Sequence, residues 1–241
     1  MCGRFFRYRK AREMAAAFRA KPNVAIADDE APHFNIPPSQ LVLAVRFNPK
    51  TRERTLDPLH WGLIPHFAKD RKYAFRCSNA RGDSIDTKAS FRGAFQKRRC
   101  IVPADGFYEW LTAGKRKLPY AFARTDRGPV ALAGVWENWM DPETGEWVRS
   151  CALITTDANG LVGRIHDRMP VILHPDDQAA WLGEKPATIQ QLKQLLAPFP
   201  AHEMAMWAVS PRLNKPDVDE PTLLEPIEDD PLLLARTPKS G

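Results

Sequence analysis

Short apolar runs at irregular spacing are the sequence feature that most restricts how this chain folds. The runs are rich in Val, Ile, Trp and Phe, residues that favour strands. Because they do not alternate regularly with helices, a doubly wound parallel sheet is disfavoured. The pattern predicts an α+β domain with a twisted, mainly antiparallel, curved sheet. Strands are expected at residues 41–47, 56–64, 100–103, 120–124, 130–139, 148–156, 169–173 and 204–209.

Helices are expected between these runs, at residues 10–20, 86–97, 175–182 and 188–196. In the first of them, Met14, Ala17 and Phe18 share one face. Asp176 and Thr188 stand where an N-cap would stabilise the last two helices.

One domain is predicted for residues 1–222. The Pro- and acid-containing residues 223–241 are predicted to form a loosely ordered tail.

Composition and charge narrow the class of protein. The chain has 241 residues, of which 44% are hydrophobic, so it is long enough to bury a core without disulfides or metals. The formal net charge of +6 favours polyanionic partners without requiring one. The four cysteines and six histidines lack the spacing of a zinc site, and neither a metal nor a cofactor is expected. No secretory signal or membrane-length apolar run occurs, so a cytoplasmic protein with reduced cysteines is expected. A monomer is expected as well.

Cys2 follows Met1, whose removal is expected because the cysteine side chain is small. Removal would place an α-amine and a thiol on adjacent carbons. Such an amine, with a pKa of about 8, condenses with an aldehyde to an imine, which the thiol closes to a thiazolidine. Arg4 is expected to favour the thiolate electrostatically. A cysteine at position two usually has no role, so the remaining sequence must decide.

Three later segments supply further polar groups. Asn79 lies in an Asn-Ala-Arg sequence, Glu109 lies among aromatic residues after a polar turn, and His166 lies in a polar loop before a strand. Taken singly, each has an ordinary structural explanation: a turn former, an exposed strand residue, or an imidazole bonded to backbone. Together with Cys2 they provide the thiol, amide, carboxyl and imidazole of a nucleophilic site.

Five motifs in this order resemble those of the SOS response-associated peptidase (SRAP) family. They are Met-Cys-Gly-Arg-Phe at 1–5, Trp-Gly-Leu-Ile-Pro at 61–65, Asn-Ala-Arg at 79–81, Val-Pro-Ala-Asp-Gly-Phe-Tyr-Glu-Trp at 102–110 and Ile-His-Asp-Arg-Met-Pro at 165–170. The resemblance runs from Cys2 to about Pro211. It implies a single α+β domain with a barrel-like sheet, flanking helices and a groove for single-stranded DNA. It also implies that Cys2, freed of Met1, crosslinks to abasic sites through a thiazolidine in the DNA damage (SOS) response. The protein is then expected at the nucleoid when bound to DNA.

The same resemblance implies a role for each matching residue. Cys2 would be the nucleophile, and Asn79 would position its amine and the opened deoxyribose. Glu109 would act as general acid and base, in an apolar setting that raises its pKa. His166 would handle a proton at the sugar hydroxyl or in reversal. Arg4 and Arg81 would hold phosphates, Asn35 would line the groove, and two aromatic residues would contact DNA, namely Phe67 and Trp110.

Two departures from the family pattern affect the expected DNA contacts. Family members often carry two tryptophans after Trp-Gly-x-x-Pro, whereas residues 66–68 here are His, Phe and Ala. Phe67 can stack on a base, a contact of about 1–3 kcal/mol, but Ala68 cannot. A family arginine is absent around Ala89, with two basic residues as candidate substitutes, Lys88 and Arg92.

Two other functions remain open on the sequence. One is a cysteine peptidase, acting on itself or on other proteins, which the thiol, His166 and Asn79 would suit. The other is a non-covalent binder of single-stranded DNA. Interleaved basic and aromatic residues at 4–10 and 91–99 would suit that function, although such runs more often form a solvated face.

Overall fold

A closed barrel of strands lies at the centre of one half of the structure, a computed structural model that describes residues 2–24, 26 and 31–228. The strands β11 (Trp147–Asp157), β10 (Val130–Met140), β7 (Arg99–Ala104), β4 (Leu41–Asn48) and β5 (Glu53–Trp61) pair in this order. A parallel pairing between β5 and β11 closes the ring. Three short strands extend it: β12 (Arg168–Pro170) and β6 (Asn79–Arg81) pair with β11, and β2 (Ala20–Pro22) pairs with β5.

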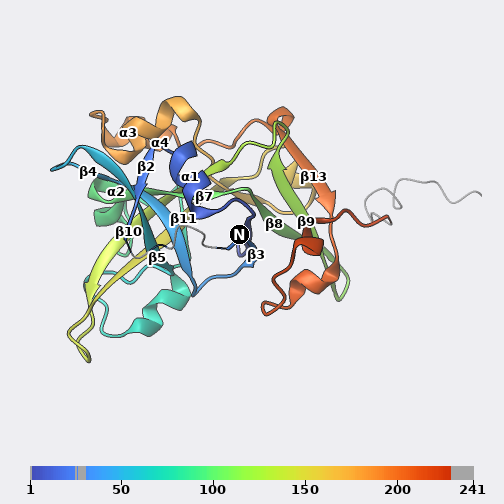
Figure 1. The fold of residues 1–241 in the computed structure, drawn as a ribbon, viewed down its shortest axis with the longest axis horizontal. Coiled ribbons are helices and arrows are strands. Elements are labelled where there is room, and N and C mark those ends of the chain that lie inside the picture. The colour runs from blue at the N-terminus through green and yellow to red at the C-terminus, as the bar shows by residue number, and fades with distance from the viewer. Residues whose placement is uncertain (1, 25, 27–30, 229–241) are drawn as a thin grey trace, which may run out of the picture.

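A second sheet forms the other half of the molecule (Figure 1). Its strands pair in the order β13 (Met204–Ala208), β9 (Arg116–Arg124), β8 (Gly106–Ala113), β1 (Phe5–Arg7) and β3 (His33–Ile36). All the pairings within this sheet are antiparallel, as are most of those in the barrel. The predicted α+β fold with a mainly antiparallel, barrel-like sheet is therefore confirmed.

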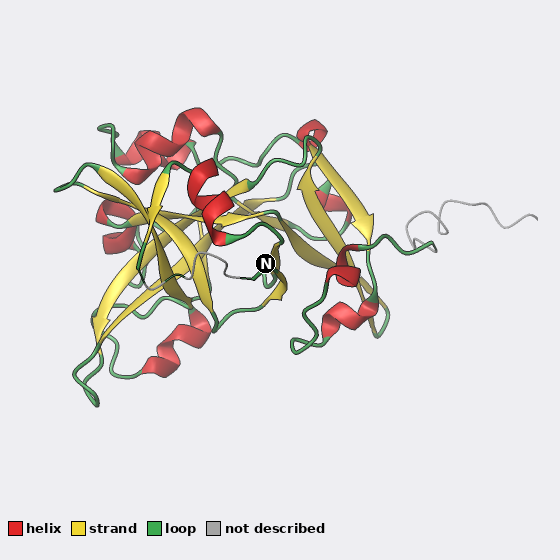
Figure 2. Cartoon of the chain, viewed as in Figure 1, coloured by secondary structure: helices red, strands yellow, loops and turns green. Residues whose placement is uncertain are grey.

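The helices α1 (Ala11–Ala17), α2 (Arg92–Lys97), α3 (Gln178–Leu182) and α4 (Ile189–Gln194) gather on the barrel side of the molecule. Figure 2 shows them as short red segments outside the yellow strands. The 3-10 helices are η1 (Arg71–Arg76), η2 (Val162–Arg164), η3 (Pro175–Asp177), η4 (Ala201–Glu203), η5 (Pro211–Asn214) and η6 (Pro221–Leu224).

Two main hydrophobic cores lie on the two faces of the barrel strands. One core joins barrel residues such as Val45 and Ile101 to the helices, through residues such as Met14 and Trp181. The other joins the barrel to the second sheet. It contains Cys2 together with Phe5, Trp61, Phe107 and Leu153. Burying a large apolar side chain contributes about 1.5–3 kcal/mol, so this second core holds the N-terminal segment firmly between the sheets.

Each apolar run predicted as a strand contains strand residues, whereas the strands β1, β2, β3, β6 and β8 were not predicted. The expected polar turn within 102–110 is confined to Asp105, between β7 and β8. The Asp105 carboxylate accepts the backbone N–H groups of Tyr8 and Arg9 at 2.7 and 3.0 Å. Contacts with a segment almost a hundred residues away thus make a one-residue corner, after which the chain continues as a strand.

The helices lie where they were predicted, but some of their bounds, caps and buried faces differ from the prediction. Thr188 caps α4 as predicted, but Asp176 caps neither η3, which begins after His174, nor α3, which begins after Asp177. The helix predicted at 86–97 is helical only in α2, because turns occupy the residues before it. In α1 the buried face contains Ala11, Met14 and Ala15, and Ala17 is exposed.

The C-terminal part of the described chain packs onto the second sheet. Leu223, in η6, is 0% exposed, and the N–H of Ile227 donates to the carbonyl of Ala208 at 3.1 Å. The predicted tail starts at residue 223, so its first residues are packed on the body, and residues 229–241 lie outside the described residues, as does Met1. Among the helices of the described chain, none has the length and apolar character needed to cross a membrane.

Candidate active site

Cys2 is fully buried at the start of the chain that leads into β1. The side-chain amide of Asn79 donates to the Cys2 carbonyl at 2.9 Å, and the Cys2 thiol lies 3.8 Å from the carbonyl oxygen of Arg4. Asn79 itself is placed by β6, where it stands opposite Leu153 of β11. The two residues predicted to work together are therefore in direct contact. The side-chain oxygen of Asn79 is buried and accepts no hydrogen bond from the described residues.

Glu109 lies on β8, opposite Tyr120 of β9, with 2% of its surface exposed. Burial raises the pKa of its carboxyl to about 7, and the negative charge of Asp167 adds to the shift. The pKa of this carboxyl is thus raised, as predicted, and burial is the main cause. A carboxyl with this pKa exchanges protons near neutral pH, as a general acid or base must.

The Cys2 thiol is not activated as a thiolate in this arrangement. Burial raises its pKa well above the usual range, and the charge of Glu109 raises it further. Arg4 meets the thiol through its backbone carbonyl, whereas its guanidinium donates to Asn35 and to the carbonyl of Leu213. Glu109 is close enough to influence the thiol.

His166 lies in the loop between η2 and β12. Its Nδ1 accepts the backbone N–H of Arg168 at 2.9 Å, and burial lowers its pKa. Asp167 Oδ1 is also 2.9 Å from Nδ1. We assign the neutral imidazole, with Nδ1 accepting from Arg168 and the proton on Nε2, because the lowered pKa disfavours the ion pair with Asp167.

Arg4 lies at the rim of the site, with its guanidinium above the Trp110 ring at 5.8 Å from the ring centroid. It donates to the side-chain oxygen of Asn35 at 2.5 Å and to the carbonyl of Leu213 at 3.3 Å. Asn35 is 2% exposed and also donates to the carbonyls of Lys215 and Val218 at 3.0 and 2.7 Å. Asn35 is therefore buried beneath Arg4 and holds its guanidinium in place.

Arg81 and Phe67 lie farther from Cys2. Arg81, two residues after Asn79 on β6, is exposed and donates twice to one oxygen of Asp83, at 3.1 and 2.8 Å. The hydrogen bonds with Asp83 are the main reason that the pKa of Arg81 is raised, and the charges of Asp157 and Asp167 add to the shift. Phe67 is 47% exposed in the loop after β5 and packs edge-on against two other rings, those of His66 and Tyr73.

A pocket of about 920 Å³ brings together four of the nine predicted site residues, and neither Cys2 nor Asn79 is part of its lining. Its lining contains the predicted residues Arg4, Glu109, Trp110 and His166. It also contains residues that the sequence analysis did not identify: Lys115, Arg116, Lys117, Leu118, Pro211 and Asn214. The Gly-Lys-Arg-Lys run at 114–117 was a visible signal for three of them. It was missed because β8 was not predicted, so the hairpin that brings this run beside Glu109 was not expected.

The positions at which this chain departs from the family pattern do not line this pocket. Ala68 is buried and its carbonyl accepts the indole N–H of Trp139 at 2.8 Å, so it belongs to the core. Lys88 and Arg92, the candidate substitutes for a missing arginine, do not line the pocket. Within the described residues, no group of three or more His, Cys, Asp or Glu side chains is arranged to hold a metal ion.

Comparison with known proteins decides the family. The family model described as "SOS response associated peptidase (SRAP)" matches residues 1–216. The chain belongs to the SRAP family. This confirms the resemblance inferred from the five motifs, and every candidate residue of this SRAP protein lies inside the matched range.

Curated relatives of this SRAP protein carry a common name. The "Abasic site processing protein YoqW" of Bacillus subtilis is 37% identical over 226 residues, which cover 93% of this chain and 99% of the relative. The "Abasic site processing protein HMCES" of Gallus gallus is 34% identical over 199 residues, which cover 73% of this chain and 59% of the relative. The SRAP protein thus spans almost all of the bacterial relative and somewhat more than half of the avian one.

Solved structures of similar proteins share the fold. A crystal structure of a protein from Bacteroides thetaiotaomicron matches with a TM-score of 0.82 and 28% identity, covering 94% of this SRAP protein and all of that chain. A second, from Bordetella bronchiseptica, matches with a TM-score of 0.74 and 27% identity, covering 87% of this protein and all of that chain.

Proposed function

We propose that this protein processes abasic sites in single-stranded DNA by forming a covalent thiazolidine through Cys2, after removal of Met1, in the DNA damage (SOS) response. The observation that carries the proposal is the setting of Cys2: Asn79 donates to its carbonyl, and the charge of Glu109 acts on its thiol. The Glu109 carboxyl has a pKa of about 7, and Glu109 lines a pocket rich in cations. The names of the curated relatives support the choice of abasic sites.

The first step is formation of an imine. The deoxyribose of an abasic site opens from its cyclic hemiacetal to an aldehyde when a base takes the proton of the C1′ hydroxyl and an acid protonates the ring oxygen. The neutral Cys2 amine adds to the aldehyde carbon, and one of its two protons moves to the aldehyde oxygen, which becomes a hydroxyl. The protonated Glu109 then gives its proton to the departing hydroxyl, which leaves as water. The products are an iminium ion and the Glu109 carboxylate.

The second step closes the ring. The Glu109 carboxylate takes the proton of the Cys2 thiol, and the sulfur attacks the iminium carbon. The electron pair of the C=N bond returns to nitrogen. A five-membered thiazolidine results, Glu109 is protonated again, and one water has been released overall. Because the thiol is neutral in its buried setting, a proton acceptor beside it is required, and Glu109 is that acceptor.

The remaining residues hold the substrate and the nucleophile. Asn79 fixes the Cys2 backbone, and its free side-chain oxygen is available to a sugar hydroxyl. Neutral His166, with its proton on Nε2, exchanges a proton with the sugar hydroxyl. Arg4 and Arg81 bind phosphates on either side of the lesion. Trp110 and the exposed ring of Phe67 offer stacking surfaces to the bases.

The test uses a labelled single strand containing one abasic site and protein whose loss of Met1 has been verified by mass spectrometry. We expect an adduct that survives heating and denaturing electrophoresis. Cys2→Ala should abolish this adduct, whereas the buried Cys77→Ala should leave it unchanged. Absence of the adduct with the processed wild-type protein would contradict the proposal, as would equal adduct formation by Cys2→Ala.

A peptidase activity restricted to Met1 is compatible with this chemistry, because it produces the reactive N-terminus. Peptidase action on other proteins is the alternative. It is disfavoured by the raised pKa of the Cys2 thiol, because attack on an unactivated amide needs a thiolate, whereas an iminium carbon is much more electrophilic. Cleavage of an added peptide by the purified protein, lost in Cys2→Ala, would establish that alternative.

A further inference from the structure

The turn that joins β8 to β9 carries three neighbouring cations, Lys115, Arg116 and Lys117. All three are exposed and line the same pocket as Glu109 and His166. None of the three forms an ion pair with a carboxylate of the described residues.

Many cations elsewhere on the surface are neutralised by a carboxylate. Examples are the pairs of Arg71 with Asp141 at 2.5 Å and of Arg212 with Glu220 at 2.6 Å. Arg4, which lines the same pocket, donates to neutral acceptors and forms no ion pair with a carboxylate of the described residues. Uncompensated positive charge is therefore concentrated around one pocket, and this arrangement favours an anionic ligand.

The hairpin is fixed in place relative to the site. The side-chain amide of Asn214 donates to the Lys117 carbonyl at 3.2 Å, while its oxygen accepts the indole N–H of Trp110 at 2.7 Å. The Lys117 ammonium donates to the Thr112 hydroxyl at 2.7 Å. The charge of Lys117 also contributes to the lowered pKa of His166, so it acts within range of the reacting groups.

We infer that Lys115, Arg116 and Lys117 form a second phosphate-binding site, which holds the DNA backbone at the pocket in addition to Arg4. This inference rests on the proposed function and deepens it. Among the residues that line the pocket, Glu109 is the one carboxylic acid, and it is partly neutral near pH 7, so the pocket stays positive. Lysines serve as point charges toward phosphate, a contact that needs no particular base sequence.

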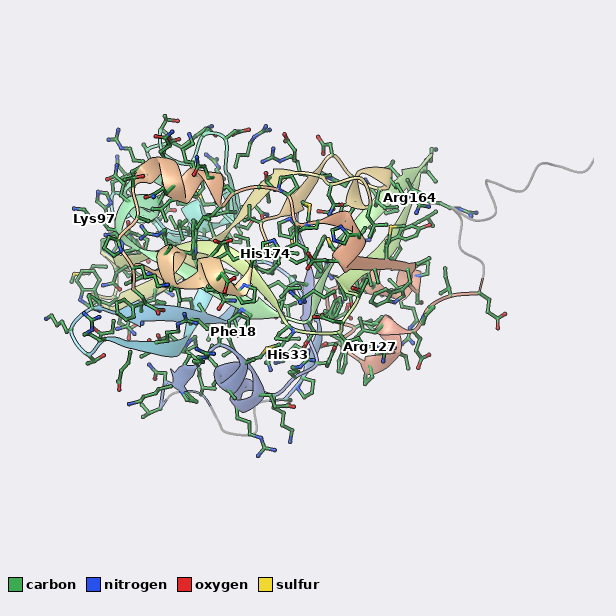
Figure 3. The ribbon with its side chains drawn as sticks, turned by 90° about the horizontal axis from the view of Figure 1, so that it is seen from above. Phe18, His33, Lys97, Arg127, Arg164 and His174 are labelled. Atoms are coloured by element: carbon green, nitrogen blue, oxygen red, sulfur yellow. The ribbon has the colours of Figure 1, made fainter. Side chains whose placement is uncertain are left out.

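The test compares two double variants with equal loss of charge. Lys115→Gln with Lys117→Gln removes two cations of the hairpin. The control, Lys50→Gln with Lys97→Gln, removes two exposed lysines that form no ion pair with described carboxylates. Lys50 follows β4 and Lys97 ends α2, both on the barrel side in Figure 1, and Figure 3 shows Lys97 at the opposite end of the molecule from Arg164.

The probe is a fluorescent single strand with a central tetrahydrofuran residue, an abasic analogue that has no aldehyde and cannot crosslink. Its Kd is measured by anisotropy at several salt concentrations. We expect the hairpin variant to bind about tenfold more weakly at moderate salt. The slope of log K against log salt should fall by about 1.4, since each phosphate contact to a single strand contributes about 0.7. Equal weakening in the control pair, or an unchanged slope, would overturn the inference.

A second measurement separates binding from chemistry. With aldehyde-bearing DNA, the hairpin variant should lose crosslinking rate mainly at subsaturating DNA and recover most of it at saturation, because the loss is one of binding. A loss of rate that is as large at saturation as below it would contradict the phosphate-binding role. If the wild-type protein forms no adduct at all, the proposed function fails, while the anisotropy of the analogue still reports whether the hairpin binds phosphate.

Discussion

At the scale of single residues, burial of the Glu109 carboxyl favours the proposed chemistry but lowers the stability of the folded protein. Burial on β8 raises its pKa to about 7, which keeps a proton available for imine formation near neutral pH. The same burial penalises the folded state whenever the carboxyl is ionised. The proposed chemistry therefore predicts both a characteristic pH profile and a gain in stability when the carboxyl is replaced.

The rate of adduct formation should follow a bell-shaped pH profile with a maximum near pH 7.5. The amine must be neutral, which requires a pH near or above its pKa of about 8, and Glu109 must be protonated, which requires a pH near or below about 7. Single-turnover rates between pH 5 and 9 measure the profile. Glu109→Gln should slow the reaction by about 10²-fold or more and remove the alkaline decline. An alkaline decline that persists in this variant would show that another group causes it.

Glu109→Gln should also stabilise the protein above pH 7. The unfolded carboxyl loses its proton near pH 4.5 and the folded one near 7, so stability falls as pH rises through this window and the loss is complete above it. Glutamine does not titrate. The variant should be more stable by up to about 3 kcal/mol at pH 8 and similar to wild type at pH 4. Urea denaturation at both pH values measures this difference, and an equal gap at the two values would exclude an electrostatic origin.

At the scale of elements, β8 is the strand that assembles the site. Glu109 and its neighbour Trp110 point to opposite faces of the strand, one toward Tyr120 and Cys2 and the other toward Arg4 and Asn214. The strand begins at Gly106, where the second sheet is tightly packed. A Cβ at this position would lie 2.2 Å from the Phe122 carbonyl oxygen and 2.3 Å from the Phe6 ring.

Gly106→Ala should therefore shift β8 and disturb Glu109. We expect a loss of stability of about 1–3 kcal/mol or more, from overpacking against a backbone group that cannot move aside, together with slower crosslinking. Gly93→Ala in α2 is the matched control. The nearest group to its Cβ is 3.8 Å away, and alanine favours a helix, so this variant should be neutral or more stable. Thermal unfolding and crosslinking rates test both, and a fully active, stable Gly106→Ala protein would contradict this role of the glycine.

At the scale of the whole molecule, the two ends of the described chain meet at the site. The segment after β13 supplies Pro211 and Asn214 to the pocket and the backbone carbonyls of Leu213, Lys215 and Val218 to Arg4 and Asn35. It is anchored by Leu213 and Leu223, which belong to the same cluster as Phe6 and Tyr108. Residues 217–228 lie beyond the matched range of the family model, yet they pack against the body and complete this wall.

Leu223→Ala should lower stability by about 2–5 kcal/mol, because the side chain is 0% exposed and its removal leaves a cavity. Leu41→Ala, at a side chain that is 70% exposed, should change stability by less than about 0.5 kcal/mol. Urea denaturation of the two variants makes the comparison. Equal stabilities would show that the C-terminal segment contributes little to the folded body.

The apolar runs predicted most of the barrel because a buried strand needs a continuous set of β-favouring side chains, and that need is visible locally. The strands β1, β3 and β8 were not visible in the same way. Their positions depend on partners far along the chain, such as Phe5 opposite Ile36 and Phe107 opposite Phe122. The corner at Asp105 depends on N–H groups from residues 8 and 9, which no local pattern reveals.

The sequence by itself determined the family, the α+β class and the chemical groups of the site, because these follow from residue identity and local order. The tertiary structure decided what those groups can do. Burial sets the pKa of Glu109 and keeps the Cys2 thiol neutral, and strand pairing brings the 114–117 turn beside them. It also places Asn35 behind Arg4 and Phe67 outside the pocket. Proton affinity and proximity depend on what surrounds a side chain in space, which neighbours along the chain do not specify.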